Sequence, residues 1–199
     1  MGKKEVSPLR VIAGEFRGRR LDRIEGMDIR PTSDKVKGSL FNILGDTVID
    51  SVFLDLFGGT GGIGIEALSR GAGHVVFIDT DIKSIKVLKG NLEHLNINDN
   101  VEVFNTDYST GISKLYMHNK KFDIIFIDPP YSVGLAQNAL EEIDKHNILA
   151  QAGSIIVEHD SRDEMPSSLG KLNMYCSKKY GNTTLSFYAI NMQTQQKEE

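Results

Sequence analysis

The chain has 199 residues, of which 40% are hydrophobic and 25% charged, and its net charge is −4 at pH 7. This composition is typical of one globular domain with an extension and excludes a disordered or fibrous protein. The longest apolar runs are four or five residues, too short to span a bilayer, and the first 20 residues lack a secretion signal. Cys176 is the only cysteine, which excludes an internal disulfide and a cysteine-cluster zinc site. We therefore expect a cytoplasmic protein.

Charge is distributed unevenly along the chain. Residues 1–44 carry a net charge of +4 and the remainder −8. The basic side chains concentrate at Arg10, Arg17, Arg19 and Arg20, and such a cluster can neutralise the phosphates of a nucleic acid. From charge alone, a solvated charged hairpin is the simpler interpretation.

The N-terminal region predicts a small β-hairpin followed by a helix. Two short apolar runs, 9–13 and 21–24, are separated by glycines and arginines, and the segment 30–34 contains a helix start with Thr32 or Ser33 as the cap. The apolar residues that follow share one helical face. Gly38 lies inside this helix at a cost of about 1 kcal/mol relative to alanine, for which the sequence offers no reason. We expect residues 1–44 to form a basic extension, 45–192 the main domain and 193–199 a polar tail.

From residue 52 onwards, apolar strands alternate with amphipathic helices. Strands are expected at 52–56, 75–78, 101–104, 124–127 and 154–157, with helices between them, and a closing antiparallel hairpin at 172–180 and 183–190. Strands that are apolar throughout are typical of a parallel sheet covered on both faces. The prediction is a doubly wound, Rossmann-like α/β fold with seven strands.

Acidic residues stand at the ends of four consecutive predicted strands: Asp55, Asp79, Asp107 and Asp128. In a parallel sheet they share one edge, where ligands of doubly wound folds bind. The segment Glu158-His159-Asp160 follows the fifth strand and is interpreted as a surface turn, with a place in the same crevice as the alternative.

A glycine-rich loop, Asp55 to Gly64, follows the first strand and opens a helix. It contains the pattern G-x-G-x-x-G, and Asp79 follows Gly59 by 20 residues, where an acid could hold ribose hydroxyls. Glycines permit a tight turn and a close approach of the ligand to backbone N–H groups. A nicotinamide and an S-adenosylmethionine site both fit this loop.

The segment Asp128-Pro129-Pro130-Tyr131 favours the second cofactor. Two prolines stiffen the turn and remove two backbone donors, so a carboxylate and a free carbonyl face the crevice beside an aromatic ring. Two acceptors and a stacking ring suit a planar group that carries an exocyclic amine. Hydride transfer has no use for such a group.

These residues resemble the amino-methyltransferases with an Asp-Pro-Pro-Tyr motif, and in particular the bacterial 16S ribosomal RNA guanine-N2 methyltransferases that act on guanine-966. The likeness covers nearly the whole chain, including segments 10–14, 17–19, 30–32, 40–44, 55–57, 66–72, 122–123, 128–131 and 180–183. Gly58, Thr60, Asp79 and Gly38 depart from the usual residues; the first two stay small and Asp79 keeps its charge. The resemblance implies S-adenosylmethionine as cofactor and 16S rRNA, within an assembled or assembling 30S subunit, as partner.

The resemblance also implies roles for individual residues. Asp128, Pro129, Pro130 and Tyr131 would form the catalytic corner, with Tyr131 stacked on a base taken out of its helix or loop. The cofactor would be bound by Asp55, Phe57, Gly58, Gly59, Gly61, Asp79 and Asp107, and the RNA by Arg10, Arg17, Arg19, Arg20 and Arg30. The five histidines lack the spacing of a metal site, so we expect no metal.

Several alternatives remain open at this point. The acceptor could be adenine N6 in DNA or a protein glutamine, although we expect asparagine at the Asp128 position in the glutamine enzymes. A non-catalytic RNA-binding assembly factor could keep the cofactor pocket. A nicotinamide dehydrogenase is the remaining alternative.

Overall fold

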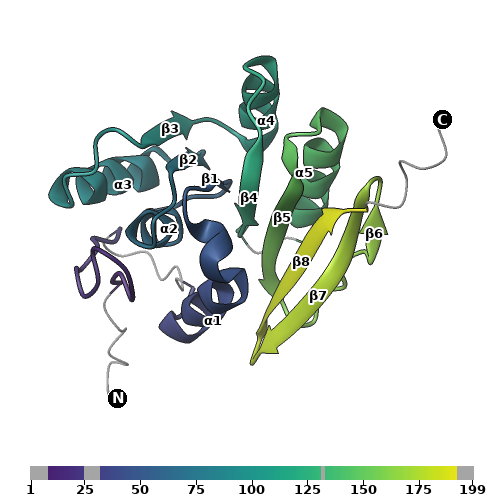
Figure 1. Ribbon diagram of the computed structural model, residues 1–199, viewed down its shortest axis with the longest axis horizontal. Helices are drawn as coiled ribbons and strands as arrows, with labels where there is room; N and C mark the ends of the chain where they lie inside the picture. The colour runs from purple at the N-terminus through teal and green to yellow at the C-terminus, as the bar shows by residue number, and fades with distance from the viewer. Residues whose placement is uncertain (1–8, 25–31, 131–132, 192–199) are drawn as a thin grey trace.

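The computed structural model describes residues 9–24, 32–130 and 133–191, so Arg30 and Tyr131 lie outside the described residues. One twisted sheet runs through the molecule with helices on both faces (Figure 1). Its strands are β1 (Val52–Asp55), β2 (His74–Asp79), β3 (Val101–Asn105), β4 (Phe122–Ile127), β5 (Leu149–Asp160), β6 (Ser168–Leu169), β7 (Leu172–Tyr180) and β8 (Thr183–Ile190). The helices are α1 (Asp34–Leu44), the 3-10 turn η1 (Gly45–Val48), α2 (Gly64–Ser69), α3 (Ile82–His94), α4 (Tyr108–Met117) and α5 (Val133–His146).

The strand order is β3-β2-β1-β4-β5-β8-β7-β6, with β1 to β5 parallel. The chain winds outward from β1 to β3, returns to the middle at β4, and continues to the other edge. The carboxyl ends of β1 and β4 therefore flank the point at which the winding reverses. This is where ligands bind in doubly wound folds.

Alternating side chains divide the core into two layers. Phe53, Phe77 and Phe126 pack with α1, α2 and α3 on one face of the sheet. Leu54 and Ile125 pack with α4 and α5 on the other face. Both layers are buried because β1, β2 and β4 are covered on both sides, as their continuous apolar runs predict, whereas the edge strand β3 is only partly buried.

The antiparallel end of the sheet differs from the prediction in three respects. The sheet has eight strands instead of seven, because the two-residue β6 pairs with β7. Strand β8 lies between β5 and β7, so it is buried on both faces, and Tyr188 on its apparently polar side is fully buried with its hydroxyl donating to the Pro166 carbonyl. Strand β5 continues through Glu158 to Asp160, so this segment is not a surface turn.

Helix α1 begins as predicted, with Ser33 accepting the Val36 N–H as its N-cap. Its buried residues Val36, Leu40 and Leu44 join the same core layer as β1 and β2. None of the described helices is both long and apolar enough to cross a bilayer.

Gly38 is not required by any contact in this helix. A Cβ at this position would lie 3.6 Å from Ile12 Cδ1, which is ordinary van der Waals contact. We expect Gly38→Ala to raise the free energy of unfolding by about 0.5–1 kcal/mol, measured by urea denaturation. Gly64→Ala is the matched control, since its Cβ would lie 2.2 Å from the Phe77 ring and must destabilise the fold. A loss of stability in Gly38→Ala would contradict this interpretation.

The N-terminal arm, residues 9–24, forms a small antiparallel hairpin that is docked on α2. Its two sides are joined by the Arg10–Arg20 bridge and by the Leu21 N–H donating to the Leu9 carbonyl. Gly14, at φ +81°, allows the arm to approach α2 so closely that a Cβ there would lie 1.7 Å from the Ser69 carbonyl oxygen. The predicted hairpin is therefore held against the main domain.

Candidate active site

Four carboxylates gather on one edge and one face of the sheet. Asp55 and Asp79 end β1 and β2, Asp128 directly follows β4, and Glu158 lies near the end of β5. Each of the four stands two residues after a core side chain that packs on the side of α1, α2 and α3. Side chains of a strand alternate between the two faces of the sheet, so all four carboxylates lie on this same side. Asp55, Asp79 and Asp128, three of the four predicted acids, thus come together with Glu158, which the sequence analysis interpreted as part of a surface turn.

Asp55 is buried and holds the end of the glycine loop by a hydrogen bond. One carboxylate oxygen accepts the Gly64 N–H at 2.9 Å, so the first backbone donor of α2 is occupied by the protein itself. Burial raises the pKa of Asp55 to about 7, an effect that the Gly64 hydrogen bond opposes and the charge of Asp79 reinforces. The Gly64 N–H is therefore not available to a ligand in this structure.

Asp79 clamps the same loop from the neighbouring strand. Its two oxygens accept the Gly59 N–H at 2.7 Å and the Asp81 N–H at 2.8 Å. The side chain is half-buried, and a carboxylate can accept about four hydrogen bonds, so acceptor capacity remains for ligand hydroxyls.

The glycines of the loop between β1 and α2 differ in their surroundings, and Gly59 has open space beside it. Gly59 has a φ of +52°, and the nearest atom to a Cβ there is the Phe57 carbonyl oxygen at 4.0 Å. Gly58 donates its N–H to the Ile78 carbonyl, and Gly61, at φ +90°, packs too closely on Leu88 to accept a side chain. These contacts fix the loop, called the cradle below, to β2 and α3.

Two aromatic rings border this cradle. The half-buried rings of Phe57 and Tyr108 lie 5.7 Å apart at a 40° tilt. Tyr108 opens α4, directly after Asp107, which is the N-cap of that helix and accepts the Thr110 N–H at 2.9 Å. This hydrogen bond lowers the pKa of the exposed Asp107 carboxyl. The described contacts of Asp107 are with its own helix, so its role toward a ligand stays a prediction.

Asp128 stands beside Glu158 because Ile127 pairs with Val157 in the parallel register of β4 and β5. Thr32, just before α1, donates its hydroxyl to Glu158 Oε2 at 2.8 Å. Burial raises the pKa of Asp128 well above its usual value, and the charges of Glu158 and Asp55 raise it further; Thr32 opposes the shift. Pro129 and Pro130 follow at the rim.

No site role was assigned to Glu158 and Thr32 from the sequence: a place in the crevice was only the alternative for Glu158, and Thr32 was explained by the helix start. The sequence does contain a signal for Glu158: the apolar runs Ile124–Ile127 and Ser154–Val157 are both followed directly by an acid. If the fifth strand is treated like the fourth, Glu158 falls at the same edge as Asp128.

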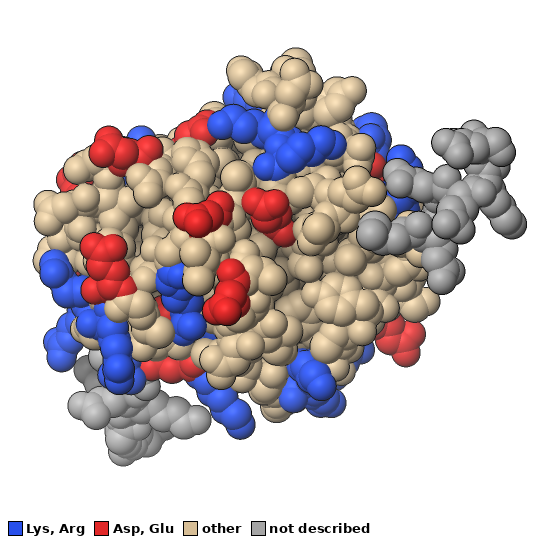
Figure 2. All heavy atoms as spheres, viewed as in Figure 1, with Lys and Arg blue, Asp and Glu red and all other residues tan. Residues whose placement is uncertain are grey.

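The predicted RNA-binding arginines have different environments. Arg10 pairs with Asp34 at 3.0 Å, and Arg19 donates to the His94 carbonyl at 3.2 Å. Arg17 and Arg20 are exposed on the arm. Figure 2 shows basic side chains gathered at the lower left, where Figure 1 places the N-terminal arm, and acidic side chains near the centre of the same face.

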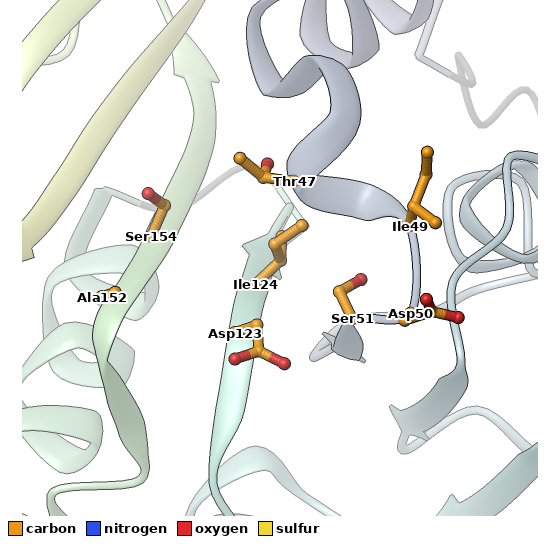
Figure 3. A pocket seen from close by; sticks show the side chains of 8 residues that line it. All are labelled: Thr47, Ile49, Asp50, Ser51, Asp123, Ile124, Ala152 and Ser154. Carbon is orange, nitrogen blue, oxygen red and sulfur yellow. The ribbon is translucent and has the colours of Figure 1, made fainter.

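A separate hollow of ≈ 340 Å³ lies at the opposite, amino-terminal edge of the strands (Figure 3). Its polar side chains are engaged locally: Thr47 donates to the Leu44 carbonyl, Ser51 to the Val48 carbonyl, and Asp123 accepts the Val52 N–H. It shares no residue with the carboxylate edge. Among the described residues, no group of three or more His, Cys, Asp or Glu side chains could hold a metal ion.

Comparison with known proteins agrees with this geometry. The family model described as conserved hypothetical protein 95 matches residues 9–189. Ribosomal RNA small subunit methyltransferase D of Escherichia coli is 32% identical over 180 residues, covering 90% of this chain and 89% of the relative. The Haemophilus influenzae protein of the same name is 38% identical over 151 residues, covering 75% and 78%.

Solved structures give the same result for the fold. The Escherichia coli protein YhhF superposes with a TM-score of 0.81 at 28% identity, covering 94% of this chain and 99% of that one. An RNA methyltransferase of Salinibacter ruber, solved with S-adenosyl-L-homocysteine, shares the fold at a TM-score of 0.63 and 15% identity, covering 85% of this chain and 99% of that one. The matched residues and the relatives show that the chain belongs to the family of ribosomal RNA small subunit methyltransferase D, described as conserved hypothetical protein 95.

Proposed function

We propose that this chain transfers a methyl group from S-adenosylmethionine to the N2 amine of one guanine, guanine-966, in the 16S rRNA of a 30S subunit in the cytoplasm. The observation that carries the proposal is the position of Asp128. It follows the strand at which the winding reverses, on the same edge and face as the acids that hold the glycine loop. Family membership supports rRNA as the substrate class.

The chemistry of the cradle fits this cofactor. S-adenosylmethionine supplies a methyl group that is electrophilic because it is attached to a sulfonium. Asp55, Asp79, Asp128 and Glu158 place four carboxyl groups on this edge, which suits a ligand with cationic and hydroxyl groups. Asp79 would accept ribose hydroxyls, the backbone of 57–61 would hold the amino-acid end, and Asp107 would accept the adenine amine. Asp55 acts through the loop, because its exposure is only 2%.

Asp128 and the Pro129 carbonyl would accept the two N–H groups of the substrate amine. The lone pair of an aryl amine is delocalised into its ring, so two acceptors that polarise both N–H bonds increase the electron density on nitrogen. Holding this nitrogen in line with the methyl group supplies much of the remaining acceleration. Pro130 would stiffen the corner. Tyr131 would stack on the base.

The N-terminal arm would bind the RNA backbone through its exposed arginines. We expect replacing Arg17, Arg19 and Arg20 together with alanine to reduce the salt slope of RNA binding by about 0.7–0.9 per lost phosphate contact. Lys145→Ala is the matched control, because this exposed lysine lies on α5, on the other face of the sheet. An unchanged slope in the triple variant would contradict this role and support the interpretation of the arm as a solvated charged surface.

The full proposal is tested by incubating the chain and tritiated cofactor with unmethylated 30S subunits, naked 16S rRNA, DNA and protein. We expect label in 16S rRNA alone, at a single N2-methylguanine located by mass spectrometry of nuclease fragments. Label in adenine, DNA or glutamine would contradict the proposal. Cofactor binding without single-turnover transfer would indicate a non-catalytic assembly factor instead.

A further inference from the structure

We infer that Asn91 of α3 joins the N-terminal arm to the cradle, so that RNA bound by the arm and cofactor bound by the cradle strengthen each other's binding. The inference rests on the proposed function, which places RNA on the arm and the cofactor in the cradle. Asn91 is a positioning residue, because it acts on both ligands through the backbone of other segments.

The side chain of Asn91 lies where the arm, the cradle and α3 meet, and only 2% of it is exposed. Its Oδ1 accepts the Asp22 N–H at 2.7 Å, and its Nδ2 donates to the Asp22 carbonyl at 3.2 Å. Nδ2 also donates to the Thr60 carbonyl at 3.0 Å. In Figure 1 the arm lies next to α2 and α3. One planar amide therefore contacts the arm, at Asp22, and the cradle, at Thr60.

The three hydrogen bonds fix the orientation of this amide. Nδ2 faces two carbonyl oxygens and Oδ1 faces an N–H group, so a rotated amide would present the wrong group to every partner. Because the side chain is buried, loss of a partner would leave a polar atom unpaired in the interior, which is costly. The amide therefore favours the arrangement in which the arm and the cradle are both in place.

Apolar side chains support the same junction. A Cβ at Gly62 would lie 3.5 Å from Leu9 Cδ1, so the start of the arm packs on the cradle. A Cβ at Gly61 would lie 2.4 Å from Leu88 Cδ1, so α3 packs on the cradle three residues before Asn91. Leu9 and Leu88 belong to the same core layer. The arm, the cradle and α3 are thus packed as one unit.

This junction links the two binding events. The Thr60 carbonyl lies within 57–61, the segment proposed to hold the amino-acid end of the cofactor, and Asp22 lies two residues beyond Arg20, a proposed RNA contact. A ligand that orders one segment also orders the other, because both are bonded to Asn91. The second ligand then loses less conformational entropy when it binds. The gain in affinity is the same in both directions.

Amide hydrogen exchange of the wild-type chain tests the link without a variant. The cofactor analogue sinefungin, which would occupy the cradle, should slow exchange of the Asp22 amide by about 5-fold or more. The Phe16 amide is the internal control, because it belongs to the arm but donates to Ser69 of α2 at 2.9 Å, and its exchange should change little. Slowing of equal size at both amides, or at neither, would overturn the inference.

Asn91→Ala removes the link itself. Ser69→Ala is the matched control, because it removes two hydrogen bonds between the arm and α2 and leaves those of Asn91 in place. The measured group is the Leu21 amide, which donates to the Leu9 carbonyl within the arm. Sinefungin should slow its exchange in the wild type and in Ser69→Ala but not in Asn91→Ala. A response that persists in Asn91→Ala would overturn the inference, and so would its loss in Ser69→Ala.

The same link should appear in the affinities. Unmethylated 30S subunits should raise the affinity of the wild-type chain for sinefungin by about 5-fold or more, and this gain should be smaller in Asn91→Ala than in Ser69→Ala. An equal gain in the two variants would overturn the inference. A wild-type chain that fails to bind sinefungin or 30S subunits contradicts the proposed function as well, whereas binding of both without mutual strengthening contradicts only the role of Asn91.

Discussion

Replacing Asp128 with alanine is expected to reduce methyl transfer by about 10²- to 10³-fold while cofactor affinity stays within a few-fold of wild type. The carboxyl group would accept an N–H bond that strengthens as the nitrogen begins to share its lone pair with the methyl carbon. In the proposed site, cofactor affinity would depend mainly on the glycine loop, which is held by Asp55 and Asp79. Single-turnover transfer and calorimetry with sinefungin measure the two quantities separately.

The activity should also depend on pH in a defined direction. Asp128 would be the stronger acceptor for the amine as a carboxylate, and its pKa is raised by burial and by the charges of Glu158 and Asp55. Activity should therefore increase as the pH rises through this raised pKa. A rate that falls over the same interval would contradict the acceptor role.

The same pKa shift also affects the stability of the variant, which urea denaturation measures. A carboxyl whose pKa is higher in the folded than in the unfolded chain destabilises the fold as the pH rises between the two values. Wild type carries this cost at pH 8 and Asp128→Ala does not, so the variant should be no less stable there. Asp123→Asn, at the other end of β4, keeps the acceptor for the Val52 N–H and should retain full activity. Normal transfer by Asp128→Ala would remove the proposed mechanism.

The parallel half of the fold could be predicted because its signals are local. Runs such as Ile124–Ile127 are apolar on both faces, and an acid follows each at the edge of the sheet. The antiparallel half depends on partners that are distant in the sequence. Strand β8 alternates apolar and polar residues like an outer strand, yet it lies between β5 and β7, and pairing with β8 also extends β5 through His159.

The site was predictable where one motif carries it and not where two segments meet. Asp79 and Asp128 follow their strands directly, whereas Thr32 reaches Glu158 across 126 positions. The ion pair between Lys37 of α1 and Glu66 of α2, here called the ionic cluster, could not be predicted for the same reason. Its two residues are distant in the sequence, but both side chains are almost fully buried and lie 3.2 Å apart.

Replacing Glu66 with alanine should therefore cost about 3–5 kcal/mol of unfolding free energy, because it leaves a buried cation without its partner. The Glu66 carboxylate accepts the N–H groups of Ile12 and Ala13, pairs with Lys37, and accepts from Arg70 at 2.9 Å. Urea denaturation measures the loss. Faster proteolysis within residues 9–24 and a smaller salt slope of RNA binding should accompany it, since the arm loses two of its hydrogen bonds to α2.

The pH dependence of the unfolding free energy lost in Glu66→Ala identifies the cause of the loss. Burial lowers the pKa of Lys37, and Glu66 is the main group that opposes this shift, so the lysine in Glu66→Ala should lose its proton more easily. A lysine whose pKa is lower in the folded chain destabilises the fold below that pKa, and the penalty disappears as the pH rises towards roughly 10. The deficit should therefore shrink at high pH. Glu142→Ala, which removes partly exposed pairs with Lys145 and His146, should cost no more than about 1 kcal/mol. A Glu66→Ala deficit equally small and independent of pH would show that the cluster does not anchor the arm.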